Sequence, residues 1–197
     1  VGFAVCGSFC THDKAMEVLE QVKAHGDEIV RDAVGNLIVL KRGNGENKKK
    51  IMVAAHMDEI GLCVVKITDE GFLKVKKVGG VSAHCSFMNR VVFQNGTVGT
   101  VAAYEKPEDF KSGDIDKLYI DIGAGSKEEA EKYVKVGDCA MFEGNYQELA
   151  GRNVMAKAFD DRSACYVQLE TLKAMKTPYH DVYFVFTVQE EVGLFGA

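Results

Sequence analysis

Residues 182–197, VYFVFTVQEEVGLFGA, join an apolar segment to two adjacent carboxylates. The first seven residues are apolar or threonine, and they run continuously instead of alternating with polar residues. Such a run is typical of a strand buried on both faces, as in a sheet covered by helices. Adjacent strand residues point to opposite faces, so Glu190 and Glu191 can serve one site only if the backbone turns beyond the strand. The segment therefore predicts an α/β fold with acidic side chains at a strand end, where ligands bind in open sheets.

The composition of the 197 residues is that of a globular protein, with 47% hydrophobic and 27% charged residues. A net charge of -5 argues against nucleic acid or an anionic membrane as the main partner. No apolar run approaches the ~20 residues that span a bilayer. We interpret each cysteine as a small buried hydrophobe in a reducing cytoplasm, because no C-x-x-C pair occurs. The six cysteines are Cys6, Cys10, Cys63, Cys85, Cys139 and Cys165.

The first 60 residues and the last 47 have the alternation of helix and strand patterns that is typical of an α/β domain. Apolar spacing predicts an amphipathic helix from Asp13 to Val30 and a second helix over residues 160–175. Residues 36–40 (NLIVL) and 51–55 (IMVAA) are predicted strands, and the lysine-rich stretch between them indicates a solvated hairpin turn.

The segment from Gly61 to Ala150 has a different pattern, in which short β-rich segments are separated by turn residues. This pattern indicates a small barrel or sandwich, with one short helix capped by Ser126. We therefore expect one α/β domain built from residues 1–60 and 151–197, interrupted by a β-rich domain at residues 61–150.

The stretch IMVAAHMDEIG, residues 51–61, ends a predicted strand in an imidazole and two carboxylates. A period of two places His56 and Asp58 on the same face of the strand. An aspartate in that position can accept the second ring N–H of a metal-binding histidine and orient it. A core histidine hydrogen-bonded to its neighbour explains the pattern equally well, so this stretch alone decides nothing.

Two further acidic pairs follow the same arrangement. Asp160 and Asp161, in KAFDDRSAC, precede a helix, where they can act as simple caps or place a carboxylate between two cations. Glu190 and Glu191 can divide metal binding and proton transfer between them, or cap the turn of a solvated loop. Taken together, His, Asp and Glu at the ends of buried segments match the N/O ligand set of a hydrolytic zinc or cobalt site. A carboxylate beside such a site supplies the base.

The motifs AAHMDEIG (54–61), AFDDR (158–162) and TVQEEVGLFGA (187–197) resemble those of the tetrahedral aminopeptidases. These are cytosolic dinuclear metallopeptidases that include glutamyl and deblocking aminopeptidases, some formerly labelled endoglucanases. The resemblance implies a partial three-layer catalytic domain of the zinc-peptidase type in the outer segments. It also implies that the barrel-like insert is a dimerisation domain, and that the chain forms homo-oligomers, which are dimers and dodecamers in the full-length family.

The resemblance further implies the role of each site residue. His56 would bind one of two divalent ions (zinc or cobalt), Asp160 would bridge both, Glu191 would bind the second, and Glu190 would be the general base. Asp58 would orient His56, and the peptide bond between Asp160 and Asp161 would be cis. The implied reaction removes N-terminal residues from peptides with a free N-terminus by metal-activated water.

The family carries two more metal ligands, an Asp and a His, downstream of its GLFGA motif. Both would lie beyond Ala197, so we expect the chain to be a fragment with little or no activity of its own. Two other functions remain open from the residues alone. A glycoside hydrolase also uses paired carboxylates, although tryptophan is absent and His56 would have no role in that mechanism. The other is a non-catalytic module that only assembles through its β-rich domain.

Overall fold

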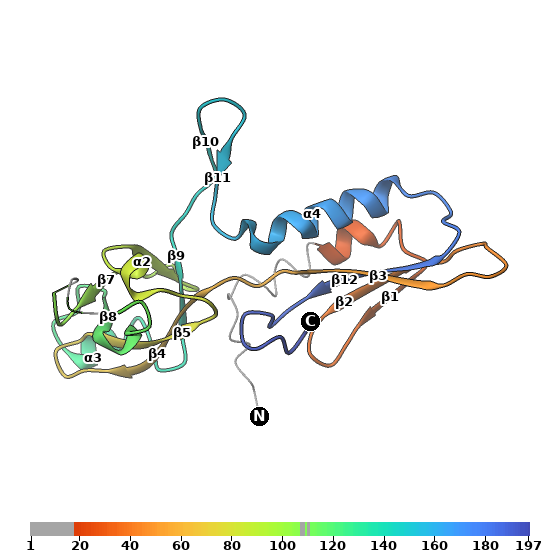
Figure 1. Ribbon diagram of the computed structural model, residues 1–197. Coiled ribbons are helices and arrows are strands. Elements are labelled where there is room, and N and C mark those ends of the chain that lie inside the picture. The colour runs from red at the N-terminus through yellow and green to blue at the C-terminus, as the bar shows by residue number, and fades with distance from the viewer. Residues whose placement is uncertain (1–17, 107–108, 110) are drawn as a thin grey trace. The chain divides into compact units, whose positions relative to one another are not determined.

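The computed structural model of the protein describes residues 18–106, 109 and 111–197. The chain divides into two compact units, which meet in the sequence at residues 59/60 and 157/158. The α/β unit contains β1 (Glu28–Arg31), β2 (Leu37–Lys41), β3 (Lys50–His56), α4 (Phe159–Ala174) and β12 (Asp181–Thr187) (Figure 1). None of the helices within the described residues combines the length and apolarity needed to cross a bilayer.

The sheet of the α/β unit has the strand order β1-β2-β12-β3. The inner strand β12 pairs antiparallel with β2 and parallel with β3, where Thr187 lies opposite His56. Every residue of β12 except the half-buried Tyr183 is buried. The structure thus confirms the burial of β12 that the continuous apolar run predicts. The helices within the described residues, however, cover one face of the sheet and not both.

The structure corrects two predictions in the N-terminal segment. Residues 18–22 are helical, but Glu28–Arg31 form β1, which pairs antiparallel with β2; residues 13–17 lie outside the described part. Residues 36–40 and 51–55 do contribute two strands, but β12 lies between β2 and β3, so they form no hairpin. The inner position between β2 and β3 gives β12 a hydrogen-bonded neighbour on each side, which suits its continuous apolar run.

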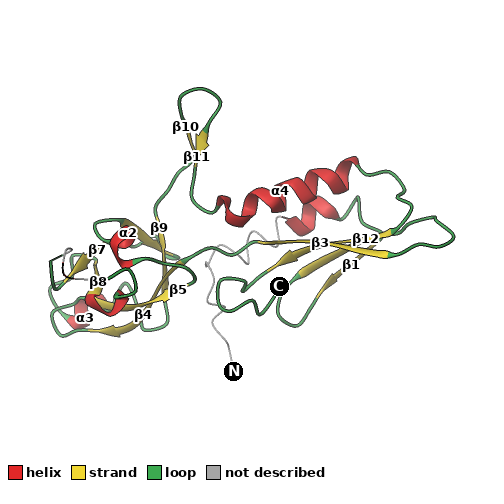
Figure 2. Ribbon diagram, viewed as in Figure 1, coloured by secondary structure: helices red, strands yellow, loops and turns green. Residues whose placement is uncertain are grey.

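The helices of the α/β unit cover one face of this sheet (Figure 2). Val22, Leu169 and Leu172 pack in one buried cluster with Phe184 and Phe186 of β12. Burying each such side chain stabilises the unit by about 1.5–3 kcal/mol. Within α4, two residues just after Phe159 have non-helical backbone angles, so the regular helix begins at residue 162 and confirms most of the predicted helix 160–175.

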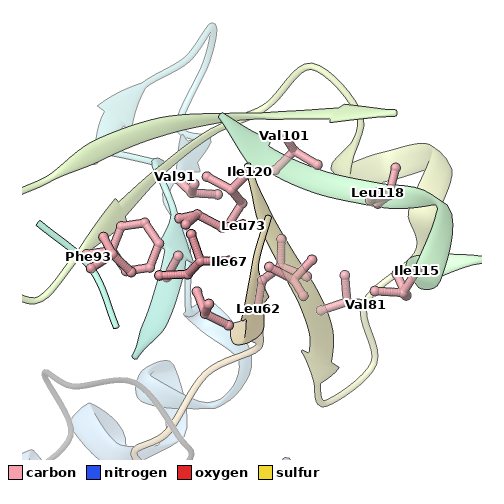
Figure 3. Close-up of a cluster of buried hydrophobic side chains, with 14 of the residues drawn as sticks. Leu62, Ile67, Leu73, Val81, Val91, Phe93, Val101, Ile115, Leu118 and Ile120 are labelled. Carbon is pink, nitrogen blue, oxygen red and sulfur yellow. The ribbon is translucent and has the colours of Figure 1, made fainter. Parts of the chain in front are cut away.

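The second unit is a closed barrel with the strand order β4-β5-β8-β7-β6-β9. Leu62, Phe93 and Ile120 point into its core, each no more than 2% exposed (Figure 3). Its short helix α3 begins after Ser126, whose Oγ accepts a hydrogen bond from the Glu129 N–H at 3.2 Å, as predicted. The barrel strands are β4 (Gly61–Ile67), β5 (Leu73–Val78), β6 (Arg90–Phe93), β7 (Val98–Ala103), β8 (Leu118–Asp121) and β9 (Cys139–Phe142).

Short elements complete the barrel unit. They are α2 (Ala83–Ser86), η2 (Ile115–Lys117), α3 (Lys127–Ala130) and the two-residue strands β10 (Gln147–Glu148) and β11 (Val154–Met155). β10 and β11 pair with each other as a separate antiparallel hairpin. The expected mixed α/β class with a barrel-like β-rich unit is therefore confirmed.

Candidate active site

The site begins where β3 and β12 end. Because the two strands are parallel and Thr187 lies opposite His56, their carboxyl ends coincide. The Met57 N–H continues the pairing and donates to the Thr187 carbonyl at 2.8 Å. The residues that follow each strand therefore leave the sheet at the same edge, where open α/β sheets place their ligands.

A backbone turn at Gln189 brings both glutamates to this edge. Gln189 has φ of 59°, a left-handed conformation that non-glycine residues seldom adopt. The main-chain N–H groups of Glu190 and Glu191 then both point at the Asp58 carboxylate, donating at 3.2 and 3.0 Å. Asp58 is fully buried, so its two oxygens fix the main chain on which both glutamate side chains are carried.

The side chains of His56, Glu190 and Glu191 converge. Each offers a donor atom, and these atoms all lie within 4.8 Å of one another. The His56 Nε2 is 3.8 Å from the Glu190 Oε2 and 3.1 Å from the Asp160 Oδ1. The Asp160 side chain is 93% exposed, so it meets the cluster from the solvent side. Three segments that are distant in sequence thus meet around one imidazole.

The other ring nitrogen of His56 faces the main chain. Its Nδ1 lies 3.1 Å from the Asp58 carbonyl oxygen and 3.6 Å from the Asp58 carboxylate, which is too long for a hydrogen bond. Burial lowers the pKa of His56, but the hydrogen bonds with the Asp58 carbonyl and the Asp160 carboxylate and the charges of Asp58 and Glu190 outweigh it, so that the pKa is raised. The surroundings of the imidazole therefore favour a positive charge.

The residues present fit a divalent cation. An imidazole nitrogen and carboxylate oxygens are the donors that zinc and cobalt accept, and the cluster provides both kinds. The carboxylates of Asp160, Glu190 and Glu191 near the imidazole supply the negative charge that a divalent cation requires. Of the ligands expected from the sequence, His56 and Glu191 belong to this cluster, together with Glu190, the expected base. Asp160 is not one of its members and contacts His56, at 3.1 Å.

Asp161 and Cys165 follow Asp160 in the segment assigned to α4. The peptide bond between Asp160 and Asp161 is cis, as the family resemblance implies. Cys165 donates its thiol hydrogen to the His56 carbonyl at 3.3 Å. Burial, together with the charge of Asp161, raises the pKa of Cys165 to about 12, so this thiol stays protonated and holds the end of β3 against α4.

Three residues that sequence reasoning missed support the site. Arg162 donates from Nε to the Met57 carbonyl at 3.0 Å and pairs with the buried Glu59 at 3.2 Å. Asn36 accepts from the Val188 N–H at 2.9 Å and donates to the Gly196 carbonyl at 2.8 Å, clamping both sides of the turn. Glu59 and Arg162 belong to the motifs HMDEIG and FDDR, but their pairing spans about one hundred residues and leaves no local pattern.

Comparison with known proteins identifies relatives across nearly the whole chain. A protein of Acetivibrio thermocellus, provisionally named an aminopeptidase, is 52% identical over 180 residues, which are 91% of this chain and 53% of that protein. The solved aminopeptidase APDkam598 from Desulfurococcus kamchatkensis is 40% identical with a TM-score of 0.84, covering 94% of this chain and 53% of that one. The TET1 peptidase of Pyrococcus horikoshii, described as assembling into a tetrahedron or a large octahedral shell, is 38% identical with a TM-score of 0.78 over 92% and 56% of the two chains.

The chain therefore spans about half the length of the relatives that it matches. The family described as M42 glutamyl aminopeptidase matches residues 35–197, which include the whole barrel unit, the α/β unit from β2 onward and every residue of the cluster. This match covers far more than half of the sequence, and the chain belongs to the M42 glutamyl aminopeptidase family.

Proposed function

We propose that this chain acts in a metal-dependent aminopeptidase, with its active centre at the carboxyl ends of β3 and β12. One observation carries the proposal, namely the convergence of His56, Glu190 and Glu191 within 4.8 Å at a sheet edge. Membership of the M42 family supports the reaction class, which is hydrolysis of the N-terminal peptide bond. A glycosidase would need only its carboxylates, so the central imidazole favours the peptidase.

In this proposal His56, Asp160 and Glu191 would hold two divalent cations, and Asp160 would serve as a ligand to both. When bound, such ions polarise the scissile carbonyl and make water acidic enough to attack near neutral pH. Glu190 accepts the proton of the attacking water and returns it to the leaving amine. Asp58 keeps Glu190 and Glu191 in place through their main-chain N–H groups.

The substrate is proposed to be a peptide with a free N-terminus. The carboxylates of Asp160 and Glu190 beside His56 would attract the positively charged α-amine of such a peptide. An internal peptide bond offers no such amine, so cleavage is restricted to chain ends.

We further propose that the 197 residues alone have little or no activity. One ion would have His56 and Asp160 as its protein ligands, and the other would have Asp160 and Glu191. Each ion would therefore have two protein ligands from this chain. Catalytic zinc sites normally have three protein ligands plus a water. The isolated chain, loaded with zinc or cobalt, is expected to leave aminoacyl-anilides intact, and brisk cleavage would contradict this.

The role of Glu190 is tested by separating binding from turnover. In the form of the protein that shows peptidase activity, Glu190→Gln is expected to lower kcat by about 100-fold or more. Calorimetric titration with zinc should change little for Glu190→Gln, whereas His56→Ala should lose the binding. The exposed Glu148→Gln serves as a matched control for both measurements. Near-normal turnover of Glu190→Gln would refute the role, and activity that survives chelation would favour a glycosidase-type mechanism instead.

Assembly into homo-oligomers through the barrel unit is also proposed. The P. horikoshii relative is described as assembling into a tetrahedron or a large octahedral shell, and the β10–β11 hairpin here exposes four apolar side chains that a second copy can cover. They are those of Tyr146, Leu149, Val154 and Met155, each more than 40% exposed. Replacing Leu149 and Met155 together by Glu should lower the mass measured by light scattering; an unchanged mass would rule out this hairpin as the contact.

A further inference from the structure

Two cysteines meet at the seam that closes the barrel. Cys63 on β4 lies directly opposite Cys139 on β9 in the antiparallel pairing of these strands. Directly opposite residues in such a pair point to the same face of the sheet. The neighbouring Leu62 and Val64 are buried in the barrel core, so the two half-buried thiols lie on the outer face.

The main-chain hydrogen bonds around Cys63 and Cys139 show whether these residues form a hydrogen-bonded or a non-hydrogen-bonded pair of the antiparallel ladder. The Val64 N–H donates to the Asp138 carbonyl at 2.9 Å, one residue beyond Cys63 and Cys139. This bond makes the two cysteines a non-hydrogen-bonded pair, whose Cα atoms in antiparallel sheets lie about 4.5 Å apart. Disulfides span Cα separations of roughly 4.4–6.8 Å, so the backbone of this pair can accept one.

The two sulfur atoms lie near the same backbone carbonyl oxygen, that of Gly137. The Cys63 Sγ lies 3.7 Å from the Gly137 carbonyl oxygen, and the Cys139 Sγ lies 3.9 Å from the same atom. Both side chains therefore occupy one small region above β4 and β9. This differs from the expectation that each cysteine is a separate buried hydrophobe; of the four described cysteines only Cys165 is buried.

We propose that Cys63 and Cys139 form a reversible cross-strand disulfide by exchange with low-molecular-weight disulfides. The thiolate of one cysteine attacks a sulfur of the small disulfide and releases one small thiol, leaving a mixed disulfide. The thiolate of the second cysteine attacks the protein sulfur of that mixed disulfide and releases the second small thiol. The two protein thiols are thereby oxidised, and the reagent is reduced to two thiols that carry the two protons.

The bond would tie the first strand of the barrel to its last. Strands β4 and β9 are far apart in sequence, so the link restricts the unfolded chain strongly. An oxidised barrel is therefore expected to unfold at a temperature higher by about 5 °C or more. Oxidation would thus stabilise the unit without changing its fold, because the paired strands are already in place.

The test uses the full chain and glutathione disulfide as the probe. Non-reducing peptide mapping should identify one linked pair of peptides containing Cys63 and Cys139, and the melting temperature should rise and return after dithiothreitol. Cys63→Ser and Cys139→Ser should each lose the linked peptide and the shift. The exposed Cys85→Ser is the matched control and should keep both.

Two results would overturn the proposal. One is a map that shows only glutathione adducts, or links between other cysteines, with no peptide joining residues 63 and 139. The other is a rise in melting temperature that persists in Cys139→Ser. The peptide map of the unsubstituted chain decides the question even if a serine variant folds poorly.

Discussion

Removal of the buried Asp58 carboxylate should destabilise the α/β unit strongly. Asp58 is fully buried and accepts the main-chain N–H groups of Glu190 and Glu191 at 3.2 and 3.0 Å. A hydrogen bond to a charged acceptor contributes about 1.5–3 kcal/mol, and a buried donor left without one carries a penalty of similar size. Asp58→Ala removes both acceptors, so the expected loss in unfolding free energy is about 3–5 kcal/mol.

Asp58→Asn separates the two hydrogen bonds. Its amide oxygen can still accept one N–H, but its NH₂ group faces the other donor. We therefore expect about half the loss of the alanine variant, roughly 1.5–3 kcal/mol. Glu28→Gln is the matched control in the same unit, since Glu28 is 51% exposed in its pair with Arg42 and such pairs contribute about 1 kcal/mol or less.

The assay must report on the α/β unit alone. Hydrogen exchange of the β12 amides does so, and a chelator in the buffer keeps bound metal from adding stability. Urea unfolding followed by circular dichroism gives an independent value for the same variants. The reasoning would be refuted if Asp58→Ala cost less than about 1 kcal/mol, or if the asparagine variant lost as much as the alanine variant.

Two further predictions concern the barrel core and the pH dependence of the sheet. Ile120→Ala should destabilise the barrel by about 2–5 kcal/mol in urea unfolding, because Ile120 is fully buried, whereas the half-exposed Val98→Ala should cost less than about 0.5 kcal/mol. The Gly43 N–H and the Lys48 ammonium lower the pKa of Asp181 below its ordinary value of 3.8, so the ionised Asp181 stabilises the fold above that pH. This stability is lost as the pH falls through the lowered pKa; the difference in unfolding free energy between the parent and Asp181→Asn should therefore narrow from pH 7 to pH 2, and a constant difference would contradict it.

Features of the fold that depend on neighbouring residues in the sequence were predicted from local sequence patterns. The continuous apolar run predicted the burial of β12, and the position of Glu190 and Glu191 just after it predicted their arrival at a sheet edge. The turn that both need is made by Gln189, although no glycine marks it in the sequence. The family motifs supplied the assignment of roles, which spacing alone left open.

Pairing between distant segments was not predictable in this way. The hairpin prediction failed because β2 and β3 are neighbours in sequence, while β12, more than one hundred residues later, lies between them in the sheet. The helix prediction ran past Gly26, where a Cβ would come within 2.5 Å of the Val39 side chain. That close approach explains the glycine, but it is visible only once β1 and β2 are paired.

The position of β3 has a practical consequence for handling the isolated chain. Within the described residues β3 pairs with β12 alone, and its Ile51, Met52 and Val53 are 41%, 70% and 40% exposed. Unpaired N–H and C=O groups on such a strand can template addition of a strand from another molecule, which is a common route to aggregation. The barrel offers no equivalent starting point, because its sheet closes on itself. Concentrated samples should therefore become turbid because molecules aggregate through β3. The Met52→Lys variant should stay clear under the same conditions.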